Sequence, residues 1–168
     1  GPTAVIDLPA QQTFTGGGTY TEIGTGTVFP IVDTTANTIY IENHAFETGY
    51  QADYDATTLD AAATVVGGLT SGTSYFAIRV SKDKIKLAAS LSDANAGNAI
   101  SLSSEGTLSQ FFQGRRATAT LTQTGGVIDG FTVTDGGSGY QNPPIITITD
   151  SGAGCLLYTS PSPRDVRS

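Results

Sequence analysis

The fold is decided by the stretch from Ser74 to Leu87, which reads SYFAIRV, then SKDK, then IKL. Along the first run the side chains alternate between two faces, one with Tyr75, Ala77 and Arg79 and the other with Phe76, Ile78 and Val80. An alternation with a period of two is typical of a β-strand. The polar residues 81–84 predict a turn, and residues 85–87 return as the second arm of an antiparallel hairpin.

The composition of the whole chain favours the same class of structure. The chain has 168 residues, of which 14% are charged, and Thr is the commonest residue, with Gly at 21. Both Thr and Gly are poor helix formers, and Thr favours extended backbone, so a helical bundle is disfavoured. With 15 Asp and Glu against 8 Lys and Arg, the net charge is −7, which disfavours a nucleic-acid partner. The absence of a long apolar run in the sequence predicts no membrane insertion.

Further short elements are expected along the first two thirds of the chain. Extended segments are predicted over 13–15, 19–21, 38–41, 51–54, 100–102 and 108–112. The first two flank Gly16-Gly17-Gly18, which predicts a hairpin between them. Proline cannot donate to a strand ladder, so the strand around Pro30 is expected at a sheet edge or at a strand entry. A single short helix is expected through residues 93–96, capped by Ser90 or Ser92 and ended by Gly97.

A change of composition after Arg115-Arg116 indicates a second module. Residues 117–124 alternate strictly, Gly125-Gly126 predicts a turn, and 127–134 and 145–149 read as strands. One face of the first of these strands carries only threonines, at positions 118, 120, 122 and 124. The expected fold class is therefore all-β, with a β-sandwich or barrel-like module and one short helix over residues 3–115. A small Gly/Thr-rich β-module, truncated at its end, follows over residues 116–154.

The two ends of the chain do not continue the pattern of short strands and glycine-rich turns. Gly1-Pro2 looks like the pair of residues that a tag-cleaving protease leaves behind, with a processed natural N-terminus as the alternative. Residues 155–165 read CLLYTSPSPRD and resemble the translation of a transposase sequencing adapter. We therefore expect residues 155–168 to be a non-biological tail, with a natural Pro/Ser tail as the alternative. The single cysteine, Cys155, lies in this segment and receives no functional role.

Few residues suggest chemistry. His44 is the only histidine, and we expect it to bond a turn backbone rather than to act as a general base. The carboxylates Asp53, Asp55 and Asp60 are read as surface loop residues, with a calcium site or a glycosidase pair as the alternatives. The glycine clusters at 16–18 and 136–139 are read as turns, because neither precedes a helix that could hold a phosphate. No catalytic, cofactor-binding or metal-binding residue is assigned, and no cofactor is expected.

Five tyrosines offer an alternative of a different class. Tyr presents an apolar face and a hydroxyl, so such residues can form a platform on which a sugar ring stacks. In all-β domains they more often fill cross-strand pairs, and we favour that interpretation. The residues concerned are Tyr20, Tyr40, Tyr50, Tyr54 and Tyr75.

Four segments of the first module carry a resemblance to known proteins. They are Asn43–Gly49 (NHAFETG), Gly67–Phe76 (GGLTSGTSYF), Ile85–Ala88 (IKLA) and Ala94–Gly97 (ANAG). Together they resemble a β-rich module of tailed-bacteriophage structural proteins, which is also similar to repeats in large bacterial surface proteins. The chain departs from the usual pattern at Ala45, where glycine is usual, and at Tyr50, where aspartate is usual.

The second module carries a resemblance of its own. Gly136-Gly137-Ser138-Gly139-Tyr140, followed by Pro143-Pro144 and the strand 145–149, is similar to a short module of phage tail and fibre proteins. These resemblances imply a structural protein of the tail, baseplate or fibre, located in the virion. They also imply self-association, for which trimers are frequent in fibres, contacts with other virion proteins, and a host-surface glycan as a further partner. A repeat of a bacterial extracellular adhesin and a carbohydrate-binding or hydrolytic module stay open as alternatives.

Overall fold

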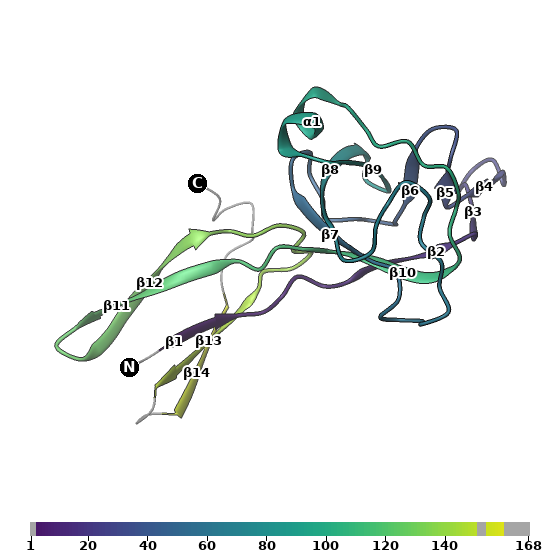
Figure 1. Cartoon of the computed structure of the whole chain (residues 1–168). Coiled ribbons are helices and arrows are strands. Elements are labelled where there is room, and N and C mark those ends of the chain that lie inside the picture. Colours follow the sequence, from purple (N-terminus) through teal and green to yellow (C-terminus); the bar gives the residue numbers. More distant parts are fainter. Residues whose placement is uncertain (1–2, 151–153, 160–168) are drawn as a thin grey trace. The chain divides into compact units, whose positions relative to one another are not determined.

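The structure is a computed structural model that describes residues 3–150 and 154–159, with side chains described over 3–149. It is almost entirely built of strands, as Figure 1 shows. The strands are β1 (Thr3–Ile6), β2 (Gln12–Gly16), β3 (Thr19–Thr21), β4 (Val28–Pro30), β5 (Val32–Asp33), β6 (Thr38–Tyr40), β7 (Gln51–Asp55), β8 (Ser74–Ser81), β9 (Lys84–Ala88), β10 (Leu108–Gly114), β11 (Thr118–Thr124), β12 (Val127–Asp135), β13 (Ile145–Asp150) and β14 (Gly154–Thr159). One short helix, α1 (Leu91–Ala96), accompanies them. The predicted all-β class is confirmed.

The larger unit, Gln11–Gln113, is organised by one sheet of seven strands. Its strand order is β2-β10-β7-β8-β9-β6-β5, and the sheet curls into a nearly closed, barrel-like layer. The enclosed core consists of apolar side chains from most of these strands. Its largest fully buried members include Tyr54, Phe46, Phe112, Ile39, Ile85 and Leu87.

The hairpin predicted over residues 74–87 is confirmed as β8 and β9. The two strands pair antiparallel, with Ala77 opposite Leu87 and Arg79 opposite Ile85, and the register shifts beyond Arg79. Tyr75 and Ala77 face the core, whereas Phe76 on the other face is partly exposed. The alternation read from the sequence therefore corresponds to the inner and outer faces of the sheet.

The hairpin predicted across Gly16-Gly17-Gly18 is wrong. β2 pairs with β10, and β3 pairs instead with β4 in a separate two-stranded sheet. The reason is burial: Phe14 on β2 is buried and stacks on Phe112, with ring centroids 5.7 Å apart. This long-range apolar contact outweighs the local turn signal of the glycines. Pro30 lies on β4, at the edge of the two-stranded sheet, as predicted.

The predicted helix is confirmed with its caps. Ser90 is the N-cap residue, and its hydroxyl accepts a hydrogen bond from the backbone N–H of Asp93 at 3.1 Å. Gly97 ends the helix in the left-handed conformation, with φ of 78°. Of the two serines considered as caps, the structure selects Ser90.

Of the described residues, the smaller unit contains 3–10, 114–150 and 154–159. Its strands form a hairpin, β11-β12, and a three-stranded sheet of order β1-β13-β14. The buried residues of its core are Ile6, Ala117, Ile146 and Ile148. Residues 3–10, which we grouped with the first module, belong here because β1 pairs with β13 along its whole length. The threonines of β11 are exposed, whereas Ala119 and Leu121 on its other face are partly buried, as the alternation predicts.

The predicted adapter-derived tail falls partly on described residues. Backbone pairing joins β14 to β13, with Ile146 opposite Tyr158. Residues 1–2, the predicted tag scar, and residues 160–168 lie outside the described residues. The pairing of β14 does not bear on the origin of the tail, which stays a prediction.

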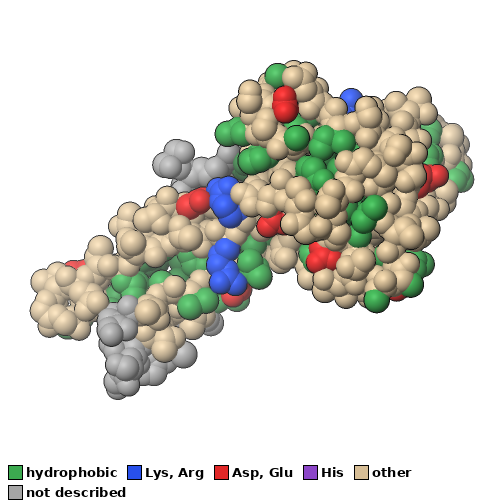
Figure 2. Space-filling view, viewed as in Figure 1, with side chains coloured by type: hydrophobic (Ala, Val, Ile, Leu, Met, Phe, Trp, Pro, Cys, Tyr) green, Lys and Arg blue, Asp and Glu red, His purple; other side chains and the backbone are tan. Residues whose placement is uncertain are grey.

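Charged side chains are sparse on the surface. In Figure 2 the acidic and basic groups of the visible face lie among a majority of uncharged side chains and backbone.

Between residues 3 and 149, no buried side-chain nitrogen or oxygen lacks a hydrogen-bond partner. In the part of the chain that the structure describes, none of the helices has the length and apolar character needed to cross a membrane.

Candidate functional site

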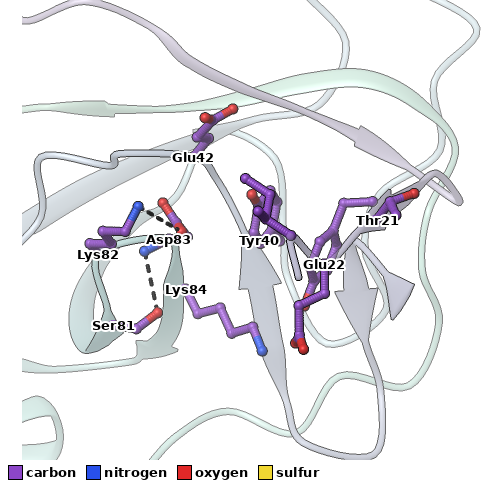
Figure 3. A pocket seen from close by; sticks show the side chains of 10 residues that line it. Thr21, Glu22, Tyr40, Glu42, Ser81, Lys82, Asp83 and Lys84 are labelled. Atoms are coloured by element: carbon purple, nitrogen blue, oxygen red, sulfur yellow. Dashed lines mark hydrogen bonds and ion pairs between the residues drawn. The ribbon is translucent and has the colours of Figure 1, made fainter. Parts of the chain in front are cut away.

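A pocket of about 520 Å³ opens on the larger unit, and Figure 3 shows it from close by. Three segments form it: the end of β3 with the turn that follows, the end of β6, and the turn between β8 and β9. The lining residues are Tyr20, Thr21, Glu22, Ile23, Tyr40, Glu42, Ser81, Lys82, Asp83 and Lys84. Its volume lies within the range typical of small-molecule sites, roughly 300–1,000 Å³.

One wall of the pocket is aromatic. The rings of Tyr20 and Tyr40 stack nearly parallel, with centroids 3.7 Å apart and planes 8° apart. Phe29, which lies opposite Tyr20 across the β3–β4 pair, extends the stack at 5.7 Å. Partial burial raises the pKa of the Tyr40 hydroxyl, and the carboxylates of Asp83 and Glu42 raise that pKa further. The Tyr40 hydroxyl is therefore uncharged at neutral pH.

The facing wall is the polar turn between β8 and β9. The carboxylate of Asp83 accepts a hydrogen bond from the backbone N–H of Asn43 at 2.9 Å and pairs with the Lys82 ammonium at 3.4 Å. Lys84 lies opposite Tyr40 in the β6–β9 register, and Figure 3 shows its side chain extending towards the strand that carries Tyr40. Its ammonium lies 5.8 Å from the centroid of the Tyr20 ring, which is a cation–π distance.

His44 contacts the backbone at both ends of this turn. Its Nε2 lies 2.6 Å from the carbonyl oxygen of Ser81 and 3.1 Å from that of Lys84, so Nε2 carries the proton and donates. Its Nδ1 accepts a hydrogen bond from the backbone N–H of Phe46 at 3.2 Å. The side chain is buried, and both ring nitrogens are used by the backbone. The predicted structural role of His44, bonding a turn backbone, is confirmed.

The pocket carries a slight excess of negative charge. Three carboxylates line it, from Glu22, Glu42 and Asp83, against the two ammonium groups of Lys82 and Lys84. The carboxylate of Glu22 accepts a hydrogen bond from the Thr25 hydroxyl at 3.1 Å. Within residues 3–149, neither Glu42 nor Lys84 forms an ion pair. These two groups are therefore available to a polar ligand.

The three carboxylates singled out from the sequence accept hydrogen bonds from nearby side chains and backbone groups. Asp53 accepts hydrogen bonds from Gln51 and Ser74, and Asp60 accepts one from the backbone of Ala62. Partial burial alone would raise the pKa of Asp55. Hydrogen bonds from Thr58 and Thr57 outweigh this effect and hold that pKa below its ordinary value. No group of three or more metal-ligating side chains occurs among the described residues.

The glycine-rich motif of the smaller unit fastens three segments of that unit together. The Ser138 hydroxyl accepts a hydrogen bond from the backbone N–H of Arg115 at 2.8 Å. The Tyr140 hydroxyl accepts one from Ala117 N–H at 3.0 Å and donates one to the Asp7 carbonyl at 2.5 Å. Burial is the main cause that raises the pKa of Tyr140. The motif therefore acts as a structural clamp.

The five tyrosines considered as a sugar platform divide into two groups. Tyr54 and Tyr75 are core residues, and Tyr50 packs against the same core. Only Tyr20 and Tyr40 come together at the pocket. Phe29 and the SKDK turn were not predicted as parts of the site, because the β3–β4 and β6–β9 pairings that assemble them leave no signal in local sequence patterns.

Comparisons with known proteins add no relative to this picture. No family model, no curated protein and no solved structure matches the chain. The likeness to phage structural modules thus stays a prediction from the sequence, and the pocket is characterised by its geometry alone.

Proposed function

We propose that this chain is a structural component of a tailed-phage virion, in its tail, baseplate or fibre, and that it acts through assembly or contact with the host surface. The observation that carries the proposal is that the side chains of the motif residues form hydrogen bonds with the protein's own backbone and so stabilise the fold. Tyr75 accepts a hydrogen bond from the backbone of Thr70 at 2.7 Å, His44 holds the β8–β9 turn, and Ser138 and Tyr140 clamp the smaller unit. Motifs used in this way support a scaffold whose role is contact.

The surface supports the same interpretation. A sparsely charged, threonine-rich sheet surface suits subunit contacts, because little charge has to be desolvated when two such surfaces meet. The exposed threonines of β11 are an example, with the Thr118 and Thr134 hydroxyls bonded across the hairpin at 2.8 Å. We therefore expect the protein to self-associate, as a trimer or a larger assembly.

The test is to locate the gene and the protein. Terminase and portal genes beside the gene, together with its peptides in purified phage particles by mass spectrometry, would support the virion role. Neighbouring secretion genes and cell-surface exposure would instead support an adhesin. A monomeric mass by light scattering at high concentration would contradict the expected self-association.

A carbohydrate-binding module is the second candidate, and the pocket is the observation that favours it. Its stacked tyrosines, together with Glu42 and Lys84, combine an apolar ring surface with hydrogen-bonding groups. Binding in a glycan array without release of sugar would distinguish such a module from a hydrolase.

A further inference from the structure

We propose that the pocket between the Tyr20–Tyr40 stack and the Ser81–Lys84 turn binds a neutral, hydroxyl-rich sugar ring of a surface glycan. The inference deepens the proposed contact with the host surface and rests on it.

The aromatic wall supplies the apolar part of the recognition. A sugar ring has one or two patches of C–H groups, which favour an aromatic surface of matching size over water. Tyr20 and Tyr40 are each half-buried, so their rings are held in place while part of each stays accessible. Because the rings are already stacked, little side-chain entropy would be lost when a ligand binds.

The polar groups that line the pocket match hydroxyls. The Glu42 carboxylate can accept hydrogen bonds from sugar hydroxyls, and the Lys84 ammonium can donate to their oxygens. Lys84 is already positioned by the rings of Tyr20 and Phe29, at 5.8 and 6.0 Å from their centroids. Ile23, which is 98% exposed, lies at the pocket and offers an apolar contact to a neighbouring sugar unit.

The charge of the pocket selects among sugars. Three carboxylates against two ammonium groups leave one negative charge in excess. Asp83 and Lys82 neutralise each other as a pair at 3.4 Å, which leaves Glu22, Glu42 and Lys84 facing a ligand. An acidic sugar would bring its carboxylate close to two like charges, so a neutral sugar is favoured.

The experiment is an NMR titration of the full chain labelled with ¹⁵N. The probes are the neutral trisaccharides maltotriose, cellotriose, mannotriose and chitotriose, with 3′-sialyllactose as the acidic comparison. Each is added to about 20 mM, well above the ~1 mM dissociation constant of weak binding. We expect at least one neutral trisaccharide to shift amides of residues 21–23, 40–42 and 81–84, and 3′-sialyllactose to bind more weakly than it.

Matched variants test the residues. Tyr40→Leu should weaken binding at least about tenfold, whereas Tyr40→Phe should retain most of the affinity. Glu42→Ala should weaken binding, and Glu105→Ala, which removes an exposed carboxylate outside the pocket, should not. If Tyr40→Leu failed to fold, the comparison of Glu42→Ala with Glu105→Ala would still test whether the sugar binds in this pocket.

Three outcomes would overturn the proposal. They are no shift in the pocket with any neutral trisaccharide, tighter binding of 3′-sialyllactose, or equal loss in the Glu42 and Glu105 variants. Failure of the proposed virion role is seen separately, in the particle proteome. A chain present in particles without sugar binding would refute this inference alone, and a sugar-binding chain absent from particles would refute the virion role.

Discussion

Replacing Tyr54 with phenylalanine removes a single oxygen atom from the core of the larger unit. Tyr54 is 1% exposed, and its hydroxyl donates to the side-chain oxygen of Gln110 while accepting from the backbone N–H of Val66 at 2.9 Å. Burial raises the pKa of this hydroxyl, which is therefore neutral at any ordinary pH. The ring itself would keep its contact with Phe112, at a centroid distance of 5.2 Å.

The loss of stability follows from the two buried groups that lose their partner, the side-chain oxygen of Gln110 and the backbone N–H of Val66. Each buried polar group without a partner costs about 1–3 kcal/mol, so Tyr54→Phe, which leaves two such groups, should lower the free energy of unfolding by about 2–6 kcal/mol. Gln110 is fully buried and held on its other side by the carbonyls of Thr64 and Thr107, at 2.7 and 3.0 Å. It therefore cannot turn to water, and the loss cannot be relieved by a rotation of its side chain.

The assay is urea denaturation followed by far-ultraviolet circular dichroism, combined with hydrogen exchange at the Val66 amide. Tyr20→Phe is the matched control, because it makes the same change at a half-buried ring and should alter stability by less than about 0.5 kcal/mol. Equal stability of the two variants, or unchanged protection of the Val66 amide, would refute the reasoning.

Three further predictions concern the turn, the clamp and an ion pair. His44→Ala should cost about 1–3 kcal/mol in urea denaturation and shift the NMR signals of the β8–β9 turn, because two carbonyls lose their donor; unchanged signals would contradict it. Gly114→Ala should destabilise the smaller unit in thermal melts much more than Gly130→Ala, because its added methyl carbon would lie 1.8 Å from a backbone oxygen, against a nearest contact of 3.3 Å at position 130. Hydrogen bonds from Arg115 hold the pKa of Asp135 below its ordinary value, so this ion pair stabilises the fold above pH ~4 and is lost as the pH falls through the lowered value. Arg115→Gln should raise that pKa in a carboxyl ¹³C titration, and an unchanged value would show that the arginine is not its cause.

The features that could be predicted from the sequence are those encoded within one short segment. The β8–β9 hairpin follows from alternation over residues 74–87, and the helix follows from Ser90 and Gly97 at its two ends. Both depend on interactions between residues a few positions apart, which a local pattern records directly.

What could not be predicted depends on pairing between distant segments. The glycines after β2 resemble a tight turn, yet the burial of Phe14 against Phe112 takes that strand to β10. The pocket likewise needs Tyr40 opposite Lys84, a neighbour relation that exists only once β6 and β9 have paired. Tyr20 and Tyr40 were identified as candidates by residue type, but no local signal distinguished them from the tyrosines of the core.

The pairing of β1 with β13 also makes the smaller unit discontinuous in sequence, with the larger unit inserted into it. On a ribosome, Ile6 emerges about 140 positions before its partner Ile146, which at ~5–20 residues per second is a delay of roughly 7–28 s. During that interval β1 has no β13 to pair with, whereas the larger unit, which ends at Gln113, is synthesised completely before β13 appears. The topology therefore sets an order of folding: the seven-stranded unit can fold first, and β1, although it is synthesised before that unit, can pair only after β13 has been made.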